Sequence, residues 1–112
     1  MSDIRTTIIK AIDEKKGEDI VEIDFSGLDG TICDAFIICS ANSYTQVEAI
    51  SQEIDRLMRE EHNEKPIRVE GRENSLWIIV DYGDVMVHIF EKETRDFYAL
   101  EKLWSDAKII KH

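Results

Sequence analysis

Carboxylate side chains in apolar segments are the residues of this sequence that come nearest to a catalytic site. Asp81 and Asp84 flank Gly83 in the segment Asp-Tyr-Gly-Asp, and Asp34 is a further carboxylate in an apolar run. Nucleotidyl transfer by two metal ions needs carboxylates that converge on one point, often as Asp-x-Asp on one strand. Asp81 and Asp84 instead straddle an expected turn, so their side chains should diverge. We interpret Asp84 as a turn former, whereas Asp81 either satisfies neighbouring backbone donors or binds a basic side chain of a partner.

The histidines and cysteines are not spaced as metal ligands. His62, His88 and His112 are far apart, and none has a histidine four positions away or a cysteine nearby. Cys33 and Cys39 would stand about 20 Å apart on one extended strand, beyond the reach of a disulfide. We expect both thiols to be small buried groups in a reducing compartment. Phosphate-binding glycine loops and the G-x-S-x-G motif are also missing from the sequence, so we expect no cofactor, no metal and no enzymatic activity.

The composition indicates a globular protein with an acidic surface. The chain has 112 residues, of which 43% are hydrophobic, and its formal net charge is -10. This length predicts a single domain, 1–112. An acidic surface repels phosphate backbones and favours basic protein partners, although the charge could also serve solubility alone. The sequence has no apolar run of membrane-spanning length and no signal-peptide pattern at its start, so we expect a cytoplasmic protein.

Helical spacing of apolar residues is found in three segments. The first is 3–16, ended by Gly17. The second is a long helix that Ser43 opens, with Gln46 at the capping-box position. The third begins after Thr94, which we expect to be its N-cap.

Strands are expected between these helices, and we expect the tail, 105–112, to fray because it shows no clear pattern. The long helix should connect two parallel strands, whereas residues 76–90 should form an antiparallel hairpin. The sequence therefore predicts an α/β fold in which a mixed sheet of about five strands is flanked by helices. The expected strands are 21–25, which should be half-buried, 33–41, which should be central, 67–69, and the two strands of a hairpin at 76–90.

The turn of the hairpin fixes which side chains share a face. Gly83 and Asp84 form a two-residue turn, with glycine at the position where a type II′ turn requires it. Tyr82 should then pair with Val85, and the register runs back from there. One face of the hairpin should be wholly apolar and should pack against helices: Ile78, Val80, Val87 and Ile89. The other face should pair Trp77 with Phe90, Ile79 with His88 and Asp81 with Met86.

This second face has more than one interpretation. A sheet face that carries Trp77 and Phe90 beside a histidine and an aspartate is typical of an interaction hot spot. If helices cover both faces of the sheet, the same residues are core, and Trp77 is a large filler. A further alternative is that the face forms a homodimer when the protein is free of other partners.

Several segments resemble the ribosomal silencing factor (Iojap-like) family. W-I-I-V-D-Y-G-D-V-M-V-H-I-F, from Trp77 to Phe90, resembles the family signature, and so does R-D-F-Y-A-L-E-K-L-W, from Arg95 to Trp104. The stretch 17–43, with T-I-C-D-A-F-I-I-C-S-A-N-S, and V-E-G at 69–71 also match. The resemblance covers nearly the whole chain, and only the tail after Trp104 is uninformative.

The resemblance implies a fold similar to nucleotidyltransferases but without their catalytic residues. It implies that the chain binds large-subunit ribosomal protein fourteen at the intersubunit face of the ribosome. Bound there, such a protein sterically blocks joining of the small and large subunits and represses translation when nutrients run short. The alternative function is a divergent nucleotidyltransferase-like enzyme that uses Asp34, Asp81 and Asp84.

The resemblance also implies where the partner binds. It places Trp77 in the region that contacts the partner, and by position we extend this assignment to four residues of the same hairpin face. Tyr98 and Glu101 belong to the second motif; Tyr98 is included among the expected partner-binding residues, although its role could be structural. The four residues added by position are Ile79, Asp81, Met86 and His88.

Overall fold

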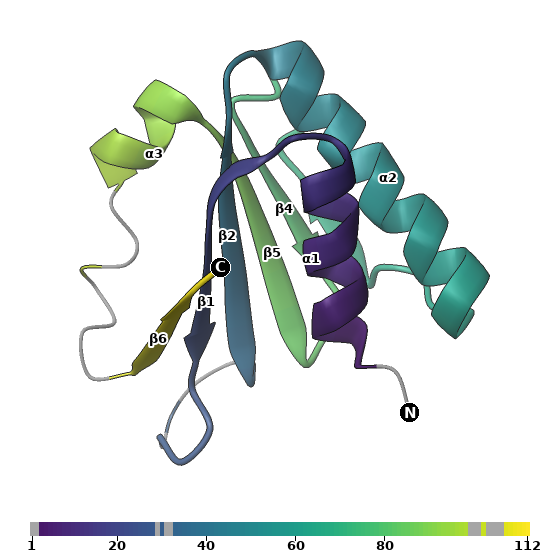
Figure 1. The fold of residues 1–112 in the computed structure, drawn as a ribbon, viewed down its shortest axis with the longest axis vertical. Coiled ribbons are helices and arrows are strands. Elements are labelled where there is room, and N and C mark those ends of the chain that lie inside the picture. The colour runs from purple at the N-terminus through teal and green to yellow at the C-terminus, as the bar shows by residue number, and fades with distance from the viewer. Residues whose placement is uncertain (1–2, 29, 31–32, 99–101, 103–106) are drawn as a thin grey trace.

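The computed structural model describes residues 3–28, 30, 33–98, 102 and 107–112, apart from the side chains of 97 and 98. Figure 1 shows a sheet with α1 and α2 on one side and α3 on the other. Within the described residues the elements are α1 (Ile4–Glu14), β1 (Glu18–Asp24), β2 (Ala35–Ala41), α2 (Tyr44–His62), β3 (Arg68–Glu70), β4 (Trp77–Asp81), β5 (Val85–Glu91), α3 (Lys92–Tyr98) and β6 (Lys108–Lys111). None of the described helices is long and apolar enough to span a bilayer.

The sheet is mixed, as the sequence predicts. Its strand order is β3-β4-β5-β2-β1-β6. β2 and β5 form a parallel pair, and the other neighbouring pairs of described strands are antiparallel. The prediction that β2 is central is confirmed, because all seven of its residues are buried. The α/β class is therefore confirmed, with six strands in the described residues where about five were expected.

The additional strand is β6, which lies in the tail that we expected to fray. Lys108–Lys111 pairs antiparallel with β1, and Figure 1 shows it beside that strand. The backbone N–H of His112 also donates to the carbonyl of Ile20 at 2.9 Å. Four residues with two central isoleucines are too few to show a period. This strand therefore depends on pairing with β1, which no local pattern reveals.

The long helix α2 has the N-cap that the sequence predicts, but the capping box closes differently. The Ser43 hydroxyl accepts from the backbone N–H of Gln46 at 3.1 Å. The Gln46 side-chain oxygen accepts from the backbone N–H of Asn42 rather than from that of Ser43. Its amide nitrogen donates to the carbonyls of Lys15 and Lys16. Gln46 thus links the start of α2 to the end of α1.

The prediction that Thr94 caps the last helix was wrong. α3 begins at Lys92, directly after β5, so Thr94 lies inside the helix. The Glu91 carboxylate accepts from the backbone N–H of Glu93 at 2.9 Å and satisfies one free donor of the first turn. A strand that passes into a helix without a loop leaves no turn signal in the sequence. The helical spacing expected after Thr94 includes three residues that lie outside the described residues: Leu100, Leu103 and Trp104.

Two apolar layers cover the two faces of the sheet. The layer under α1 and α2 contains the hairpin residues that were predicted to face helices, Ile78, Val80, Val87 and Ile89. The layer on the opposite face is centred on Phe36, Ile38 and Phe90. β1 is more deeply buried than the half-buried strand that we expected, because Glu22 is buried as well as its apolar neighbours. The Glu22 carboxylate pairs with Arg5 of α1 at 2.8 Å.

Gly71 brings the turn between β3 and β4 close to Trp77. Its φ is +92°, and a Cβ at this position would collide with the carbonyl oxygen of Trp77. Gly27 has nearly the same φ, +87°, but no atom of the described residues lies within 4 Å of the place where its Cβ would stand. The two glycines therefore share the backbone constraint, and only Gly71 has the close approach.

We predict that Gly71→Ala destabilises the protein much more than Gly27→Ala. The Gly27 variant should lose about 1 kcal/mol for its positive φ alone. The Gly71 variant should lose at least about 2 kcal/mol more, because the backbone of β4 must also move. Urea unfolding of both variants measures the difference, and equal losses would contradict the close approach.

Candidate functional site

The predicted hairpin register is confirmed and defines a candidate binding surface. β4 and β5 pair Trp77 with Phe90, Ile79 with His88 and Asp81 with Met86. Gly83 has a φ of +89°, and the backbone N–H of Tyr82 donates to the carbonyl of Val85 at 3.0 Å across the turn. We call the side of the hairpin that points away from α1 and α2 the outer hairpin face; it consists of Trp77, Ile79, Asp81, Met86, His88 and Phe90.

Burial divides the outer hairpin face between its two strands. The side chains of β4 that lie on it, Trp77, Ile79 and Asp81, are partly exposed. Those of β5 are buried: Met86 is 8% exposed, and His88 is 4% exposed. In this structure the accessible atoms of the face therefore come from β4, whereas Met86 and His88 support them from β5.

Trp77 is held in place by His88 and Phe90. The indole Nε1–H of Trp77 donates to Nδ1 of His88 at 3.1 Å. The indole ring also stacks on Phe90, with the ring centroids 4.9 Å apart and the planes 22° apart. On its other side, His88 meets Phe36 in an edge contact with a centroid separation of 4.5 Å. The indole orientation is thus fixed by a hydrogen bond and by aromatic packing.

The hydrogen bond also defines the protonation state of His88. An indole N–H can only donate, so Nδ1 of His88 must accept, and the neutral ring carries its proton on Nε2. Nε2 is buried, and it has no hydrogen-bond partner among the residues that the structure describes. Burial lowers the pKa of His88 to about 4. The ring is therefore neutral at pH 7, in the form that can accept from Trp77.

Asp81 satisfies a backbone donor, which is one of the two roles considered for it. Its Oδ1 accepts from the backbone N–H of Gly83 at 2.8 Å. Its Oδ2 lies 3.6 Å from the guanidinium of Arg68, on the neighbouring strand β3. The turn is tied to β2 as well, because the carbonyl of Asp84 accepts from the backbone N–H of Asp34 at 2.8 Å. Among the residues that the structure describes, no three His, Cys, Asp or Glu side chains are grouped so that they could hold a metal ion.

Both cysteines are free and buried, as predicted. Cys39 is fully enclosed in the layer under the helices, and burial raises the pKa of its thiol to about 12. Burial also raises the pKa of Cys33. The thiolate fraction of either side chain is thus small at neutral pH, which leaves a poor nucleophile.

Arg95 is a buried charge whose role the sequence analysis did not derive. Only 8% of this residue is exposed, and its guanidinium donates to the carbonyl of Asp19 at 2.6 Å and to the hydroxyl of Ser40 at 2.8 Å. Asp19 lies at an irregularity in the β1–β2 pairing and has a φ of +49°. Arg95 thus anchors α3 to β1 and β2. The side chain of Tyr98, the expected partner-binding residue of this motif, lies outside the described residues, and so does Glu101.

Two exposed apolar residues at the ends of β4 were missed by the sequence analysis. Leu76, directly before β4, is 42% exposed, and Ile67, directly before β3, is 72% exposed. The backbone N–H of Ile67 donates to the carbonyl of Asp81 at 2.7 Å, which places Ile67 beside the other end of β4. Both residues fall in strands that the sequence predicts, but strand alternation gives no measure of their exposure. By that alternation they share the side of Val69 and Ile78, which face the helices, and not the side of Trp77.

The whole chain matches a known family. The family described as "Ribosomal silencing factor during starvation" matches residues 1–112. The chain belongs to the ribosomal silencing factor family. The protein of this family from Halalkalibacterium halodurans, Ribosomal silencing factor RsfS, is 42% identical over 102 residues, which make up 91% of this chain and 86% of that protein.

A more distant relative and a solved structure extend the comparison. Mitochondrial assembly of ribosomal large subunit protein 1 from Mus musculus is 30% identical over 74 residues, which make up 64% of this chain and 32% of that protein. A crystal structure of a protein from Chromobacterium violaceum is 33% identical and superposes with a TM-score of 0.85 over 91% of this chain and 83% of that one. The family and the fold class predicted from the sequence are therefore confirmed.

We predict that His88 makes stability depend on pH between about 4 and 6.5. In this range the unfolded chain binds a proton at His88, whereas the folded protein keeps the ring neutral, so stability falls as the pH falls. The loss should be of the order of 2 to 3 kcal/mol. His88→Asn and His88→Phe remove this titration, so the free energy of unfolding of both variants should change less over this range. Urea unfolding at a series of pH values measures this.

The same two variants also test whether the hydrogen bond to residue 88 holds the Trp77 indole, because neither variant titrates and only one keeps an acceptor. Asn keeps an acceptor near the position of Nδ1, whereas Phe offers none. The Trp77 indole N–H should therefore exchange with solvent faster in the Phe variant than in the Asn variant, as measured by NMR. Equal exchange rates in the two variants would show that the hydrogen bond to His88 does not hold the indole.

Proposed function

We propose that this protein docks on large-subunit ribosomal protein fourteen through the outer hairpin face and so prevents the small subunit from joining. The observation that carries the proposal is a partly exposed Trp77 held in one orientation by His88 and Phe90. Trp is among the residues that dominate binding hot spots. A side chain that is already ordered loses less conformational entropy on binding, so more of its contact energy becomes affinity.

The surroundings of Trp77 support a docking role. Ile79 lies beside it on β4 and is also partly exposed. Arg68, Glu70 and Asp81 form an ion-pair group next to this surface, with separations of 3.6 and 3.8 Å. An apolar centre with a polar margin is the usual anatomy of a protein interface. The net charge of -10 favours encounter with a basic ribosomal protein over bare RNA.

The proposed mechanism is occupancy of the space between the subunits. The molecule measures 35 × 35 × 24 Å. Contacts between surfaces act over only a few ångströms, so a body of this thickness at an intersubunit face holds the two subunits apart. The mouse relative is named for assembly of the mitochondrial large ribosomal subunit, which supports that subunit as the partner. Under this proposal the protein acts in the cytoplasm when nutrients are limiting.

Docking without catalysis is part of the proposal. The alternative enzyme would need Asp34, Asp81 and Asp84 to share a divalent cation. Asp81 is instead occupied by the backbone N–H of Gly83 and by Arg68. We therefore expect calorimetry to detect no binding of Mg-ATP at millimolar concentration. Binding with a stoichiometry of one would favour the nucleotidyltransferase-like alternative.

We predict that Trp77→Ala weakens binding to purified large subunits by at least about 2 kcal/mol, or roughly thirtyfold. Truncation removes the central aromatic contact, while the β4–β5 backbone pairing remains. The dissociation constant from co-sedimentation with large subunits is the measurement, and circular dichroism verifies that the variant is folded.

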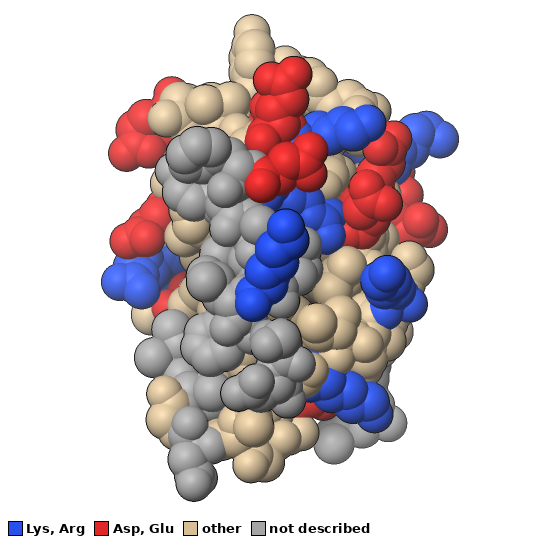
Figure 2. Space-filling model, turned by 90° about the vertical axis from the view of Figure 1, so that its left-hand side faces the viewer, with Lys and Arg blue, Asp and Glu red and all other residues tan. Residues whose placement is uncertain are grey.

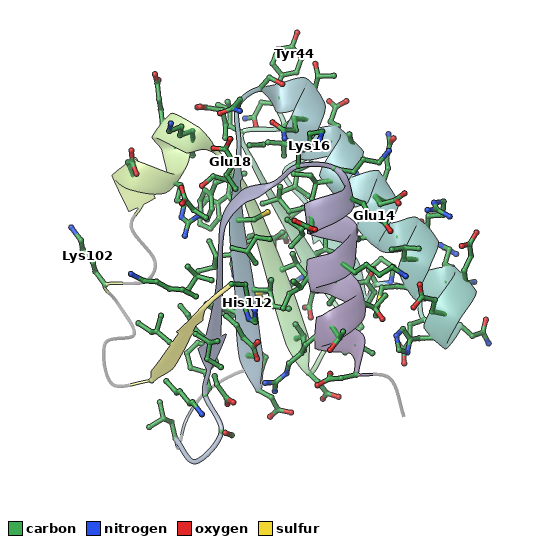
Figure 3. All side chains as sticks on the ribbon, in the orientation of Figure 1. Glu14, Lys16, Glu18, Tyr44, Lys102 and His112 are labelled. Carbon is green, nitrogen blue, oxygen red and sulfur yellow. The ribbon has the colours of Figure 1, made fainter. Side chains whose placement is uncertain are left out.

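Tyr44 provides a matched control. It is an aromatic residue that is 62% exposed, and Figure 3 shows it at the start of α2, pointing away from the sheet. Tyr44→Ala should bind large subunits as the wild type does. A folded Trp77 variant that binds as well as the Tyr44 variant would rule out the outer hairpin face as the docking surface.

A further inference from the structure

A basic pocket lies between α3 and the edge of the sheet formed by β1 and β6. Its volume is about 620 Å³. Figure 2 looks onto this side of the molecule, and Lys102 and His112, two of the lining residues, are labelled in Figure 3. The described residues with ionisable side chains that line it are Asp19, Lys92, Arg95, Asp96, Lys102, Lys111 and His112.

The described residues that line this pocket carry a net positive charge, opposite in sign to that of the whole chain. Among the residues that the structure describes, four lysines and arginines line the pocket, together with two acidic residues, Asp19 and Asp96. Cations gathered in a concave site raise the local concentration of anions even when the protein as a whole is acidic. The ligand class that fits this pocket is therefore an anion.

Two of the cations come from α3, one from β6, and the fourth is Lys102. Arg95 is fixed at the base of the pocket by its bonds to Asp19 and Ser40. Lys92 precedes it by one turn on α3 and is exposed. Lys111 of β6 is also exposed and stands opposite Val21, whose side chain belongs to the layer on the α3 side of the sheet. The two lysines thus approach the pocket from opposite walls.

The pocket shares a sheet face with Trp77. Ser40 of β2 is in register with Phe90 of β5, which in turn pairs with Trp77 of β4. Two strand spacings of about 5 Å separate Ser40 from Trp77. A partner that covers Trp77 would therefore bring its own neighbouring groups to the pocket.

We propose that this pocket binds phosphates of the ribosomal RNA that borders the protein docking site on the large subunit. This rests on the proposed function and deepens it. The acidic body repels free RNA, so these phosphates are bound only when docking at Trp77 brings them close. Lysines that contact phosphates set position and orientation and need no base sequence. The protein thus uses two contacts, an aromatic one to a protein and a basic one to RNA.

The test compares two double variants with equal changes of charge. Lys92→Gln with Lys111→Gln removes two exposed cations of the pocket. Lys15→Gln with Lys65→Gln removes two exposed cations that do not line it. Affinity for purified large subunits is measured for both variants and for the wild type at a series of KCl concentrations.

We predict that the affinity of the pocket variant depends less steeply on salt than that of the wild type, whereas the control variant keeps the wild-type slope. Each lost phosphate contact lowers the slope of log K against log salt by about 0.7 to 0.9, so the slope should fall by about 1.5. Affinity at low salt should fall by about tenfold. For purified ribosomal protein fourteen without RNA, the pocket variant should bind no more weakly than the wild type.

Other results would overturn the proposal in distinguishable ways. If both double variants keep the wild-type slope, the pocket contacts no RNA, while the assignment of Trp77 still stands. Failure of the wild type to bind large subunits would overturn the proposed function and this inference together. Micromolar binding of tripolyphosphate to the isolated protein, with NMR shifts at Ser40 and Arg95, would assign the pocket to a small phosphorylated compound instead.

Discussion

The two-residue turn at Gly83 determines which side chains of β4 and β5 point away from the helices. Because strand side chains alternate, a shift of one residue would send Trp77 into the layer under α1 and α2 and bring Ile78 to the outside. The register is secured on both sides of the turn: Asp81 accepts from the N–H of Gly83, and the carbonyl of Asp84 accepts from the N–H of Asp34 in the chain leading into β2. The orientation of the outer hairpin face follows from these few bonds.

The burial of His88, which accepts from the indole of Trp77, lowers the stability of the fold. An apolar side chain in the same place would not lower it in this way. His88 is buried, and within the described part of the chain its Nε2 has no hydrogen-bond partner; an unsatisfied buried donor costs about 1 to 3 kcal/mol. An apolar residue at this position would remove that cost but would leave the Trp77 indole N–H without its acceptor. The loss of stability is consistent with a site at which the orientation of one side chain matters for binding.

Local patterns were sufficient to predict most of the fold. The hairpin register, the α2 N-cap and the buried β2 all follow from short-range signals, namely a turn glycine, a capping serine and a nearly continuous apolar run. The start of α3 does not follow from such signals, because α3 begins directly after β5 without a loop. The strand β6 does not either, because it forms only through pairing with β1. Tertiary contacts decided both.

The candidate site was only partly predictable for a similar reason. Alternation along β4 and β5 placed Trp77, Ile79 and Asp81 on one face, but it gave no measure of exposure. The burial of Met86 and His88, and the bonds of Arg95 to β1 and β2, depend on residues distant in sequence. The basic pocket likewise combines cations from α3, β6 and Lys102, which no single motif contains.

The most direct test of the central claim is whether the bound protein keeps the ribosomal subunits apart. Purified small and large subunits are mixed under magnesium conditions that favour joining, and the products are separated on a sucrose gradient. The account predicts that the wild-type protein shifts the profile from joined ribosomes to free subunits and sediments with the large subunit, whereas Trp77→Ala leaves joined ribosomes. An unchanged profile with the wild-type protein bound to joined ribosomes would contradict the account.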